Sequence, residues 1–328
     1  MVPAAATASD RGIPVWRRIA SRRGGGTLVL AVLVAVLPLA LPNAYAYEIA
    51  IQVALNAIVC VGLNLLIGYA GQISLGHAGF FALGGYASAI LASRYGIPVW
   101  LTLPGACAIV GALAWVVGRP TLRLKGHTLA MATLGLGVII SIVLTTEDRI
   151  TGGPDGMSVP PLALFGVLVQ GERVWYWITG ALLVATVWLA LNLIDSPTGR
   201  ALRAVHGSEV AAQTLGIDIA RFKLQVFTLS AVLAALAGAI TAHYAGFITP
   251  VKASFLHSVE LVIMVVFGGM ASVFGAVVGA AALTLLPQLL TVLKDYEMMV
   301  FGAVLVATMV LFPQGVVPGI ARWFGRRP

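Results

Sequence analysis

Charged side chains are scarce in this chain of 328 residues, and that scarcity decides its class. Only 10% of the residues are Asp, Glu, Lys or Arg, whereas 59% are hydrophobic, and the mean hydropathy is +0.98. A soluble domain carries about 25% charged residues, so a soluble globular fold is excluded. A helix needs about 20 apolar residues to cross the hydrocarbon of a bilayer, and the chain offers many such runs. The sequence predicts an all-α, polytopic membrane protein.

Residue patterns for catalysis, metal binding and nucleotide binding are also missing. None of the four lysines follows a glycine, so the chain has no Gly-Lys-Ser/Thr loop for ATP phosphates. The five histidines show no H-x-x-x-H or E-x-x-H spacing, and no G-x-S-x-G elbow occurs. Cys60 and Cys107 both fall within apolar runs, which argues against a disulfide framework. We expect no catalytic residue, no metal site and no cofactor.

Ten apolar runs are candidate membrane spans, of which the third and eighth are short. Short segments bounded by glycine can be broken helices, so the expected number of spans is about ten, within eight to ten. The runs are 28–41, 49–67, 78–92, 99–118, 128–144, 175–193, 224–245, 259–269, 275–293 and 298–312.

Most lysines and arginines fall on one side of this arrangement if the N-terminus is cytoplasmic. Because cytoplasmic loops are rich in Lys and Arg, we expect both termini in the cytoplasm. The basic residues on that side are Arg11, Arg17, Arg18, Arg22, Arg23, Arg119, Arg123, Lys125, Arg200, Arg203, Arg221, Lys223, Arg322, Arg326 and Arg327.

The expected domain organisation follows from this charge pattern. A basic cytoplasmic segment, 1–26, precedes a transmembrane domain, 27–313, and a basic tail, 314–328, follows it. The transmembrane domain holds an outer loop, 145–173, and a cytoplasmic loop, 195–223. The sequence pI near 9.9 reflects this insertion pattern and not a nucleic-acid partner. Ala44-Tyr45-Ala46 after the first run mimics a signal-cleavage site, and retention or cleavage of the first span stays open.

The cytoplasmic loop 195–223 is too long and too helix-patterned to be a simple connector. Ser208 can cap a short helix that places an acidic residue at its positive end. This segment predicts a docking site for a partner protein, although a helix held at lipid headgroups by arginines is the alternative. The candidate coupling residues are Glu209, Ala211, Ala212, Leu215 and Gly216.

The stretch 62–91 is rich in glycine and carries a few polar residues. Irregular backbone at membrane depth is tolerated only where it is buried or lines a cavity, so this stretch either packs around a bend or lines a translocation path. His77 is typical of a hydrogen-bonded structural residue rather than a proton relay. The candidates are Gly71, Gln72, Ser74, Gly76 and His77. Further along, Gly275 and Gly279 form a GxxxG pair that predicts close helix packing.

Several segments spread along most of the chain resemble one known family. They include GLNLLIGYAGQISLGHAGFFALGGYASAIL, LRLKGHTLAMATLGLGVII, TGGPDGMSVPPL, SPTGRALRAVHGSEVAAQTLGIDIARFKL and LFPQGVVPG. From residue 62 onward the chain is similar to the Liv-type permeases of branched-chain amino acid ABC transporters. The TGGPDG phrase is more similar to their M-type than to their H-type subunit.

This resemblance implies a subunit of the bacterial inner membrane that works with several partners. Those partners are a second, H-type permease, two ATP-hydrolysing subunits, a periplasmic binding protein and membrane lipid. The loop 195–223 then matches the segment that contacts the ATPases, although Glu209 stands one place away from the family's E-A-A-x-x-x-G pattern. Other amino acids, urea and amides are the alternative cargoes. A stand-alone secondary transporter is disfavoured because Glu260 is the only acidic residue near a span suited to ion coupling.

Overall fold

A computed structural model of the chain describes residues 25–122, 124, 126–164, 167–169, 171–290, 299, 302–303, 306 and 315–319. The chain divides into two units, residues 1–42 and 43–328. The expected basic termini, 1–26 and 314–328, and the tenth apolar run, 298–312, lie mostly outside the described residues.

The first unit contains one short helix, α2 (Gly25–Val36), followed by a 3₁₀ turn, Leu37–Leu39. The expected span 28–41 is therefore not one continuous α-helix. Pro38 lies in the 3₁₀ turn, and proline lacks the N–H that would continue the helical hydrogen-bond ladder. The α-helix ends two residues before it.

Three helices form the centre of the second unit. They are α3 (Ala44–Asn64), which continues into a π-helical turn at Leu65–Tyr69, α4 (His77–Ser93) and α11 (Ile219–Ala245). Every residue from 57 to 68 is buried, as expected for a helix that is apolar on all sides. α11 contacts both α3 and α4, so the three helices share one core.

Five further helices surround this centre. α5 (Val99–Thr121) packs against α4 and α11, and α6 (His127–Thr146) packs against α4. α8 (Glu172–Asp195), α12 (Phe255–Gly268) and α13 (Val273–Leu290) pack against α3. The outward faces of α5, α6 and α8 expose large apolar side chains, as a lipid-facing surface requires. Examples are Val116, Met131, Ile139, Ile142, Trp188 and Leu189.

Glycine and alanine let α4 and α11 touch backbone to backbone. A Cβ added at Gly84 would lie 2.2 Å from the Ala235 carbonyl oxygen, and one added at Gly238 would lie 1.8 Å from the Phe81 carbonyl oxygen. No larger side chain fits at either position without separating the helices. Small residues serve this purpose between membrane helices.

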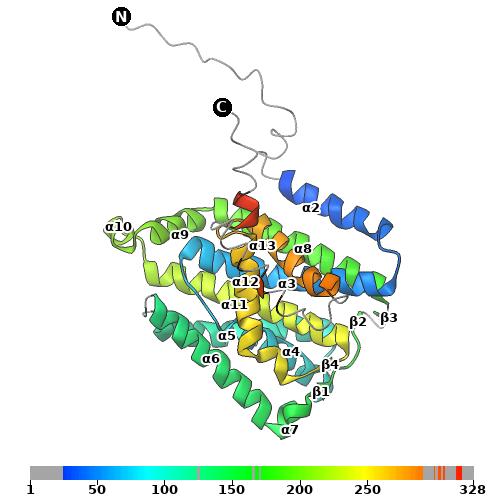
Figure 1. Cartoon of the computed structure of the whole chain (residues 1–328). Helices are drawn as coiled ribbons and strands as arrows, with labels where there is room; N and C mark the ends of the chain where they lie inside the picture. Colours follow the sequence, from blue (N-terminus) through cyan, green and yellow to red (C-terminus); the bar gives the residue numbers. More distant parts are fainter. Residues whose placement is uncertain are drawn as a thin grey trace, which may run out of the picture. The chain divides into compact units, whose positions relative to one another are not determined.

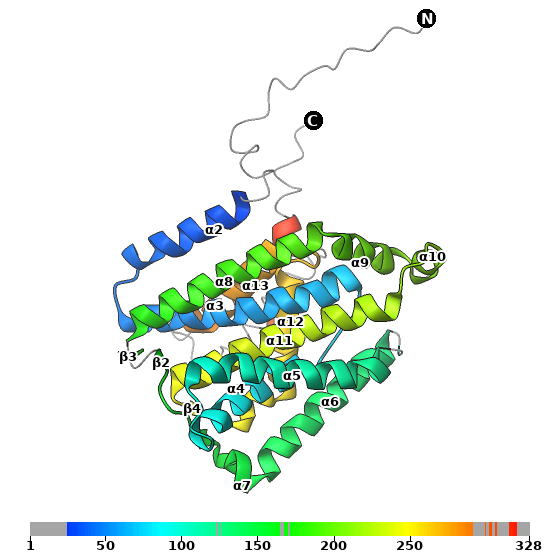
Figure 2. The same cartoon turned by 180° about the vertical axis from the view of Figure 1, so that it is seen from behind.

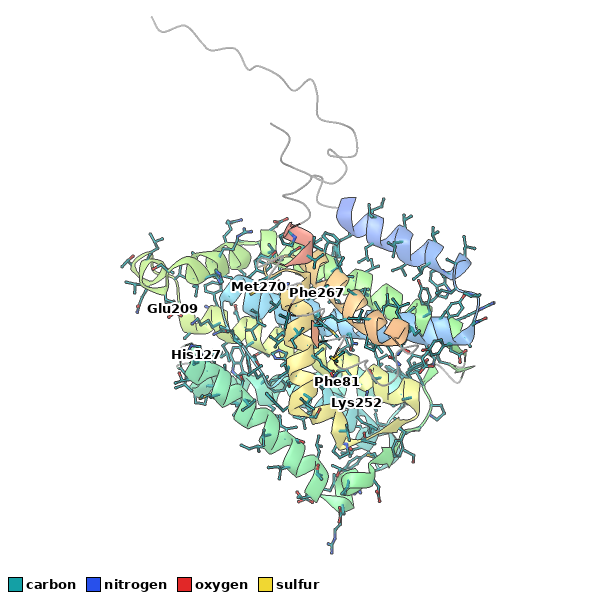
Figure 3. All side chains as sticks on the ribbon, viewed as in Figure 1. Phe81, His127, Glu209, Lys252, Phe267 and Met270 are labelled. Atoms are coloured by element: carbon teal, nitrogen blue, oxygen red, sulfur yellow. The ribbon has the colours of Figure 1, made fainter. Side chains whose placement is uncertain are left out.

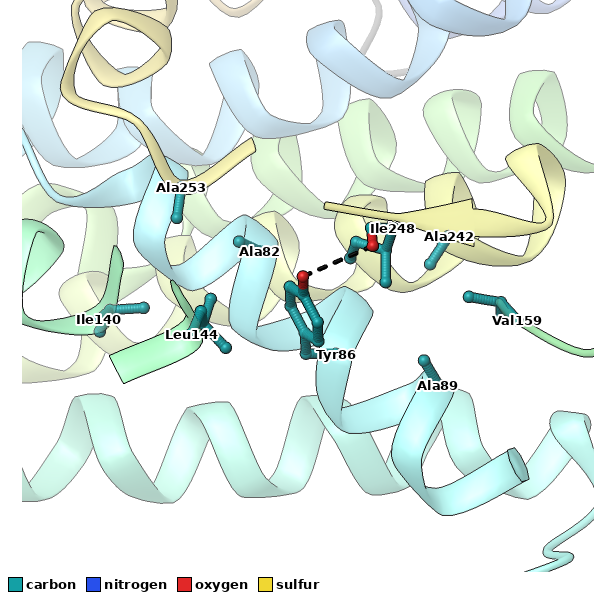
Figure 4. Close-up of a cluster of buried hydrophobic side chains, with 9 residues drawn as sticks. All are labelled: Ala82, Tyr86, Ala89, Ile140, Leu144, Val159, Ala242, Ile248 and Ala253. Atoms are coloured by element: carbon teal, nitrogen blue, oxygen red, sulfur yellow. Dashed lines mark hydrogen bonds between the residues drawn. The ribbon is translucent and has the colours of Figure 1, made fainter. Parts of the chain in front are cut away.

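The expected outer loop folds back onto the bundle. It contains α7 (Asp148–Thr151), a 3₁₀ turn (Gly153–Asp155), β1 (Met157–Ser158) and the hairpin strands β2 (Ala163–Leu164) and β3 (Val167–Leu168). β1 pairs antiparallel with β4 (Phe247–Ile248), which follows α11 and leads into a 3₁₀ turn, Pro250–Ala253. Figure 4 shows the buried cluster beneath this pairing, where the Tyr86 hydroxyl donates to the Ile248 carbonyl oxygen at 3.5 Å.

The two polar connections of the second unit lie at opposite ends of the bundle. α9 (Pro197–Gly207) and α10 (Glu209–Thr214) project from one end, whereas the short strands gather at the other (Figures 1 and 2). Among the described residues, five helices are long and apolar enough to cross a membrane: Ala44–Tyr69, Val99–Thr121, His127–Thr146, Glu172–Asp195 and Ile219–Ala245. The chain is thus an all-α membrane protein whose strands, within the described residues, are short and lie in loops, while the count of ten spans stays a prediction.

Candidate functional site

The first candidate feature is a break in the helical core between α3 and α4. After the π-helical turn the backbone takes a left-handed conformation at Gly71, whose φ of +67° favours glycine. Residues 71–76 then run without helical structure to the start of α4. Although this segment is irregular, Gln72 and Ser74 are buried. The break is therefore only partly buried, since Gly71 and Ile73 are exposed between the buried residues. Irregular backbone at membrane depth is tolerated where it is buried in protein or lines a cavity.

Side chains of neighbouring helices satisfy the backbone of the break. Thr133 of α6 accepts a hydrogen bond from the Leu75 N–H at 3.1 Å. Ser258 of α12 accepts one from the Ala78 N–H at 3.1 Å. A Cβ added at Gly76 would lie 2.4 Å from the Thr133 carbonyl oxygen. Gly76 therefore holds the break close to α6.

His77 is the polar centre of this region. Its Nδ1 lies 3.0 Å from the Ser74 hydroxyl, and its Nε2 lies 2.7 Å from the Ser230 hydroxyl on α11. The imidazole is completely buried and packs edge-on against Phe80 and Phe227. Both ring nitrogens have partners, so His77 ties the break to α11 through Ser230.

Two buried amides at the break lack part of their hydrogen bonding. The Asn64 amide nitrogen donates to the Gly269 and Ser272 carbonyl oxygens at 3.1 and 3.2 Å, but its Oδ1 has no partner among the described residues. Gln72 is 2% exposed, and neither polar atom of its side chain has a partner there. Each unpaired buried polar group costs about 1–3 kcal/mol. The break is thus polar as well as irregular.

The turn between α12 and α13 closes against the same region. The Tyr69 hydroxyl donates to the Ala271 carbonyl oxygen at 2.7 Å. A Cβ added at Gly68 would lie 2.2 Å from the Ala271 nitrogen, and one added at Gly315 would lie 2.3 Å from the Gly269 Cα. Three segments far apart in the sequence therefore meet here without intervening side chains.

Gly275 and Gly279 lie in α13 and pack against α12 of the same chain. A Cβ added at Gly275 would lie 2.6 Å from the Gly268 carbonyl oxygen. One added at Gly279 would lie 2.0 Å from the Met264 carbonyl oxygen. The GxxxG pair therefore serves helix packing inside this subunit.

The second candidate feature is the segment formed by α9 and α10. The Ser196 and Ser208 side chains cap the two helices by accepting from the Gly199 and Ala211 N–H groups, both at 3.3 Å. Gly216 ends α10 with a φ of +78°. The Lys223 ammonium of α11 lies 2.6 Å from Glu209, with side chains 7% and 30% exposed. This partly buried ion pair joins α10 to the start of α11.

One candidate coupling residue departs from its expected position. Ala212 is 1% exposed and faces the protein, so it offers no surface to a partner. The exposed apolar residues of the segment are Val210, 73% exposed, and Leu215, 76% exposed, beside the exposed Ala211. Val210 stands between Glu209 and the alanine pair and is not part of the family-like spacing, so that spacing does not indicate it.

The segment also touches the helix break. A Cβ added at Gly71 would lie 2.8 Å from the Nδ1 of His206, which is near the C-terminal end of α9. The sequence predicted neither residue as a partner of the other, because they stand far apart and neither belongs to a shared motif. The two candidate features are therefore in direct contact.

The third feature is a cavity of about 760 Å³ at the opposite end of the bundle. It is bordered by residues 48–56 of α3, by the start of α8, by the first two turns of α12 and by the last two turns of α11, with Phe81 of α4. Figure 3 shows two of its lining residues, Phe81 and Lys252, close together and far from Glu209. Its charged residues are Glu48, Glu172, Lys252 and Glu260. Sequence reasoning noticed only Glu260 among them, because no spacing connects these positions.

Comparison with known proteins identifies similar chains. Residues 45–309 match the family described as branched-chain amino acid transport system / permease component. The chain is 33% identical over 295 residues to the high-affinity branched-chain amino acid transport system permease protein LivM of Salmonella typhimurium, covering 83% of this chain and 69% of that protein. It is 34% identical to LivM of Escherichia coli over the same shares. Identity to the corresponding LivH of Escherichia coli is 26% over 280 residues, covering 80% and 90%. No solved structure matches the chain.

Proposed function

Since the chain belongs to the family of branched-chain amino acid transport permease components, we propose that it lines the translocation path of an ATP-driven importer. Its cargo is leucine, isoleucine and valine. It is a multi-pass protein of the bacterial inner membrane and more similar to LivM than to LivH relatives. Its partners are a LivH-type permease, two separate ATPase subunits and a periplasmic binding protein.

The end of the bundle that carries α9 and α10 faces the cytoplasm in this proposal. Arg119, Arg200, Arg203 and Arg221 all belong to that end, which agrees with the enrichment of basic residues on the cytoplasmic side. Both termini are cytoplasmic as well. A membrane-impermeant thiol reagent added to sealed cells should label a cysteine placed at Pro154 but not one placed at Ser208. Equal labelling at both positions would overturn this orientation.

α10 is the surface on which an ATPase subunit docks. Val210 and Leu215 present apolar side chains outside the hydrocarbon-facing helices, where a partner's groove could cover them. Four other residues shape this surface. Glu209 holds α10 through its ion pair, and Ala212 holds it through its buried side chain. Ala211 is small and exposed, and Gly216 ends the helix. A docked partner therefore contacts a rigid segment and not a loose loop.

One observation carries the coupling proposal: the docking segment is attached to the core at two places. The Glu209–Lys223 pair links α10 to α11, and His206 of α9 abuts Gly71 at the helix break. Because α11 and the break both belong to the central core, a displacement of the docking segment must move the core. ATP-driven motion of the ATPases thereby reaches the transport path.

A charge placed on the docking surface tests this role. Leu215→Arg should abolish co-purification of the ATPase subunits, because burying an unpaired charge at an apolar contact costs several kcal/mol. The matched control is Tyr95→Arg, since Tyr95 is 72% exposed and lies in a loop at the other end of the bundle. The control should retain the ATPases.

The alternative, in which the segment only anchors to lipid headgroups, predicts the opposite result. An added arginine would then strengthen the contact with anionic lipid and leave ATPase binding intact. Normal ATPase recovery with Leu215→Arg, together with normal receptor-stimulated hydrolysis, would overturn the docking assignment. The relatives are named as permease components, which favours this function over that of a stand-alone transporter.

A further inference from the structure

We propose that the cavity opposite the docking segment is a binding site for a free, zwitterionic α-amino acid with an aliphatic side chain. This inference rests on the proposed function, because it places a selective site for the same cargo within the permease itself. The cavity volume of about 760 Å³ falls in the range of small-molecule sites, about 300–1,000 Å³. With the docking segment in the cytoplasm, the cavity faces the side from which a binding protein delivers cargo.

The cavity carries charged residues of both signs that do not form ion pairs with each other. Lys252 supplies a cation, whereas Glu48 in the second turn of α3 and Glu172 at the start of α8 supply carboxylates. Among the described residues, Lys252 and Glu172 form no ion pair with any neighbour, and the Glu48 carboxylate accepts only from Gln52 at 3.4 Å. An α-amino acid brings the two complementary groups, a carboxylate for Lys252 and an ammonium for the glutamates.

A histidine adds a directed hydrogen-bonding group to this cavity. The His257 Nδ1 lies 3.3 Å from the Glu260 carboxylate, and in the neutral tautomer that donates from Nδ1 its Nε2 is an acceptor. Nε2 is buried and has no partner among the described residues. A buried acceptor left without a donor is unfavourable. An ammonium N–H of a bound amino acid would satisfy it once the imidazole turns toward the cavity.

The wall of the cavity below these charges is apolar. Leu55, Phe81 and Ile248 line it and are each almost completely buried. Phe81 packs edge-on against His257, with ring centroids 5.6 Å apart. This places an apolar surface next to His257. A branched aliphatic side chain fits such a wall, whereas a sugar would leave hydroxyl groups unpaired against it.

The test uses the assembled complex in nanodiscs without the binding protein, so that only the permease can select. An Ala245→Cys reporter places a thiol on an exposed lining position without removing a hydrogen bond of the site, and protection from a small thiol reagent reports occupancy. Three probes are compared: leucine, leucinamide, which lacks the carboxylate, and 4-methylpentanoate, which lacks the ammonium. Leucine should protect at about tenfold lower concentration than either analogue, as expected for one lost charge-assisted hydrogen bond.

Variants of Lys252 assign the carboxylate contact. In the reporter background, Lys252→Gln should remove the advantage of leucine over leucinamide, and Lys252→Arg should retain it. The control is Arg173→Gln, because Arg173 lies at the same end but stacks over the Tyr47 ring and does not line the cavity. The site is overturned by equal protection from all three probes, by absent protection at saturating leucine, or by an advantage that survives Lys252→Gln.

ATP- and receptor-dependent leucine uptake by the wild-type complex is measured in parallel to separate the two proposals. Uptake without Lys252-dependent protection would overturn the cavity site alone. Protection without uptake would overturn the proposed importer function and leave an amino-acid binding site. Absence of both would overturn both.

Discussion

Replacing Gly71 with alanine perturbs the helix break and its contact with α9 at once. The φ of +67° at this position costs an L-residue about 1–2 kcal/mol. The added Cβ would also lie 2.8 Å from the His206 Nδ1, and relieving such overpacking costs about 1–3 kcal/mol. His206 is exposed and can move, so the contact should contribute near the lower end of that range.

A second variant separates these two costs. His206→Ala alone should be nearly neutral for stability, since it removes an exposed side chain. In the double variant the steric cost disappears and only the backbone strain remains. We therefore expect Gly71→Ala to destabilise the complex by about 2–3 kcal/mol and the double variant by about 1–2 kcal/mol.

The assay measures thermal unfolding of the reconstituted complex together with receptor-stimulated ATP hydrolysis. Gly71→Ala should lower both, and adding His206→Ala should restore part of the stability. Effects of distant, independent sites add within about 0.3–0.5 kcal/mol. Strictly additive effects of the two substitutions would refute the contact between α9 and the break.

Two other substitutions test the Glu209–Lys223 ion pair and the packing of α13 against α12. Lys223→Met should lower the free energy of local opening of the segment 197–214 by about 1–3 kcal/mol, which limited proteolysis would report as faster cleavage. The loss is smaller than the roughly 3–5 kcal/mol of a fully buried pair, because Glu209 is partly exposed. Unchanged cleavage would contradict the role of this ion pair in joining α10 to α11. Gly279→Leu should prevent accumulation of folded chain, because its Cβ would lie 2.0 Å from the Met264 carbonyl oxygen. Its control is Gly135→Leu in α6, where an added Cβ meets nothing within 4 Å; equal yields of the two variants would contradict the packing role.

Local signals in the sequence predict much of the secondary structure. Runs without charge predict α5, α6, α8 and α11 to within a few residues, because such runs are stable only as buried or lipid-facing helices. Ser208 predicts the start of α10, because its hydroxyl accepts a hydrogen bond from the N–H three residues later and such a cap depends only on neighbouring residues. Pro38 could have predicted the early end of α2 by the same kind of reasoning.

Tertiary contacts decide which face of a short helix is buried, and the local sequence does not show it. α10 spans only Glu209–Thr214, so the hydrophobic pattern contains too little periodicity to distinguish its two faces. The Glu209–Lys223 pair fixes the rotation of the helix, and this turns Ala212 inward and Val210 outward. Neither orientation can be obtained without knowing where α11 begins.

The cavity is the least predictable feature. Glu48, Glu172 and Lys252 come from three helices or turns that meet only because α3, α8 and α11 are neighbours in space. Each residue alone is an ordinary polar residue at the end of a membrane span. They form one charged cavity only when folding brings the ends of those spans together.

Uptake by purified components tests the central claim most directly. Proteoliposomes are prepared with this chain, a LivH-type permease, the two ATPases and the binding protein, and radiolabelled leucine uptake is followed with ATP supplied on the cytoplasmic side of the complex. We expect leucine accumulation that requires ATP, the binding protein and this chain. Other branched-chain amino acids should compete with leucine for uptake, whereas urea and amides should not. Accumulation by this chain alone, driven by an ion gradient and indifferent to ATP, would contradict the account.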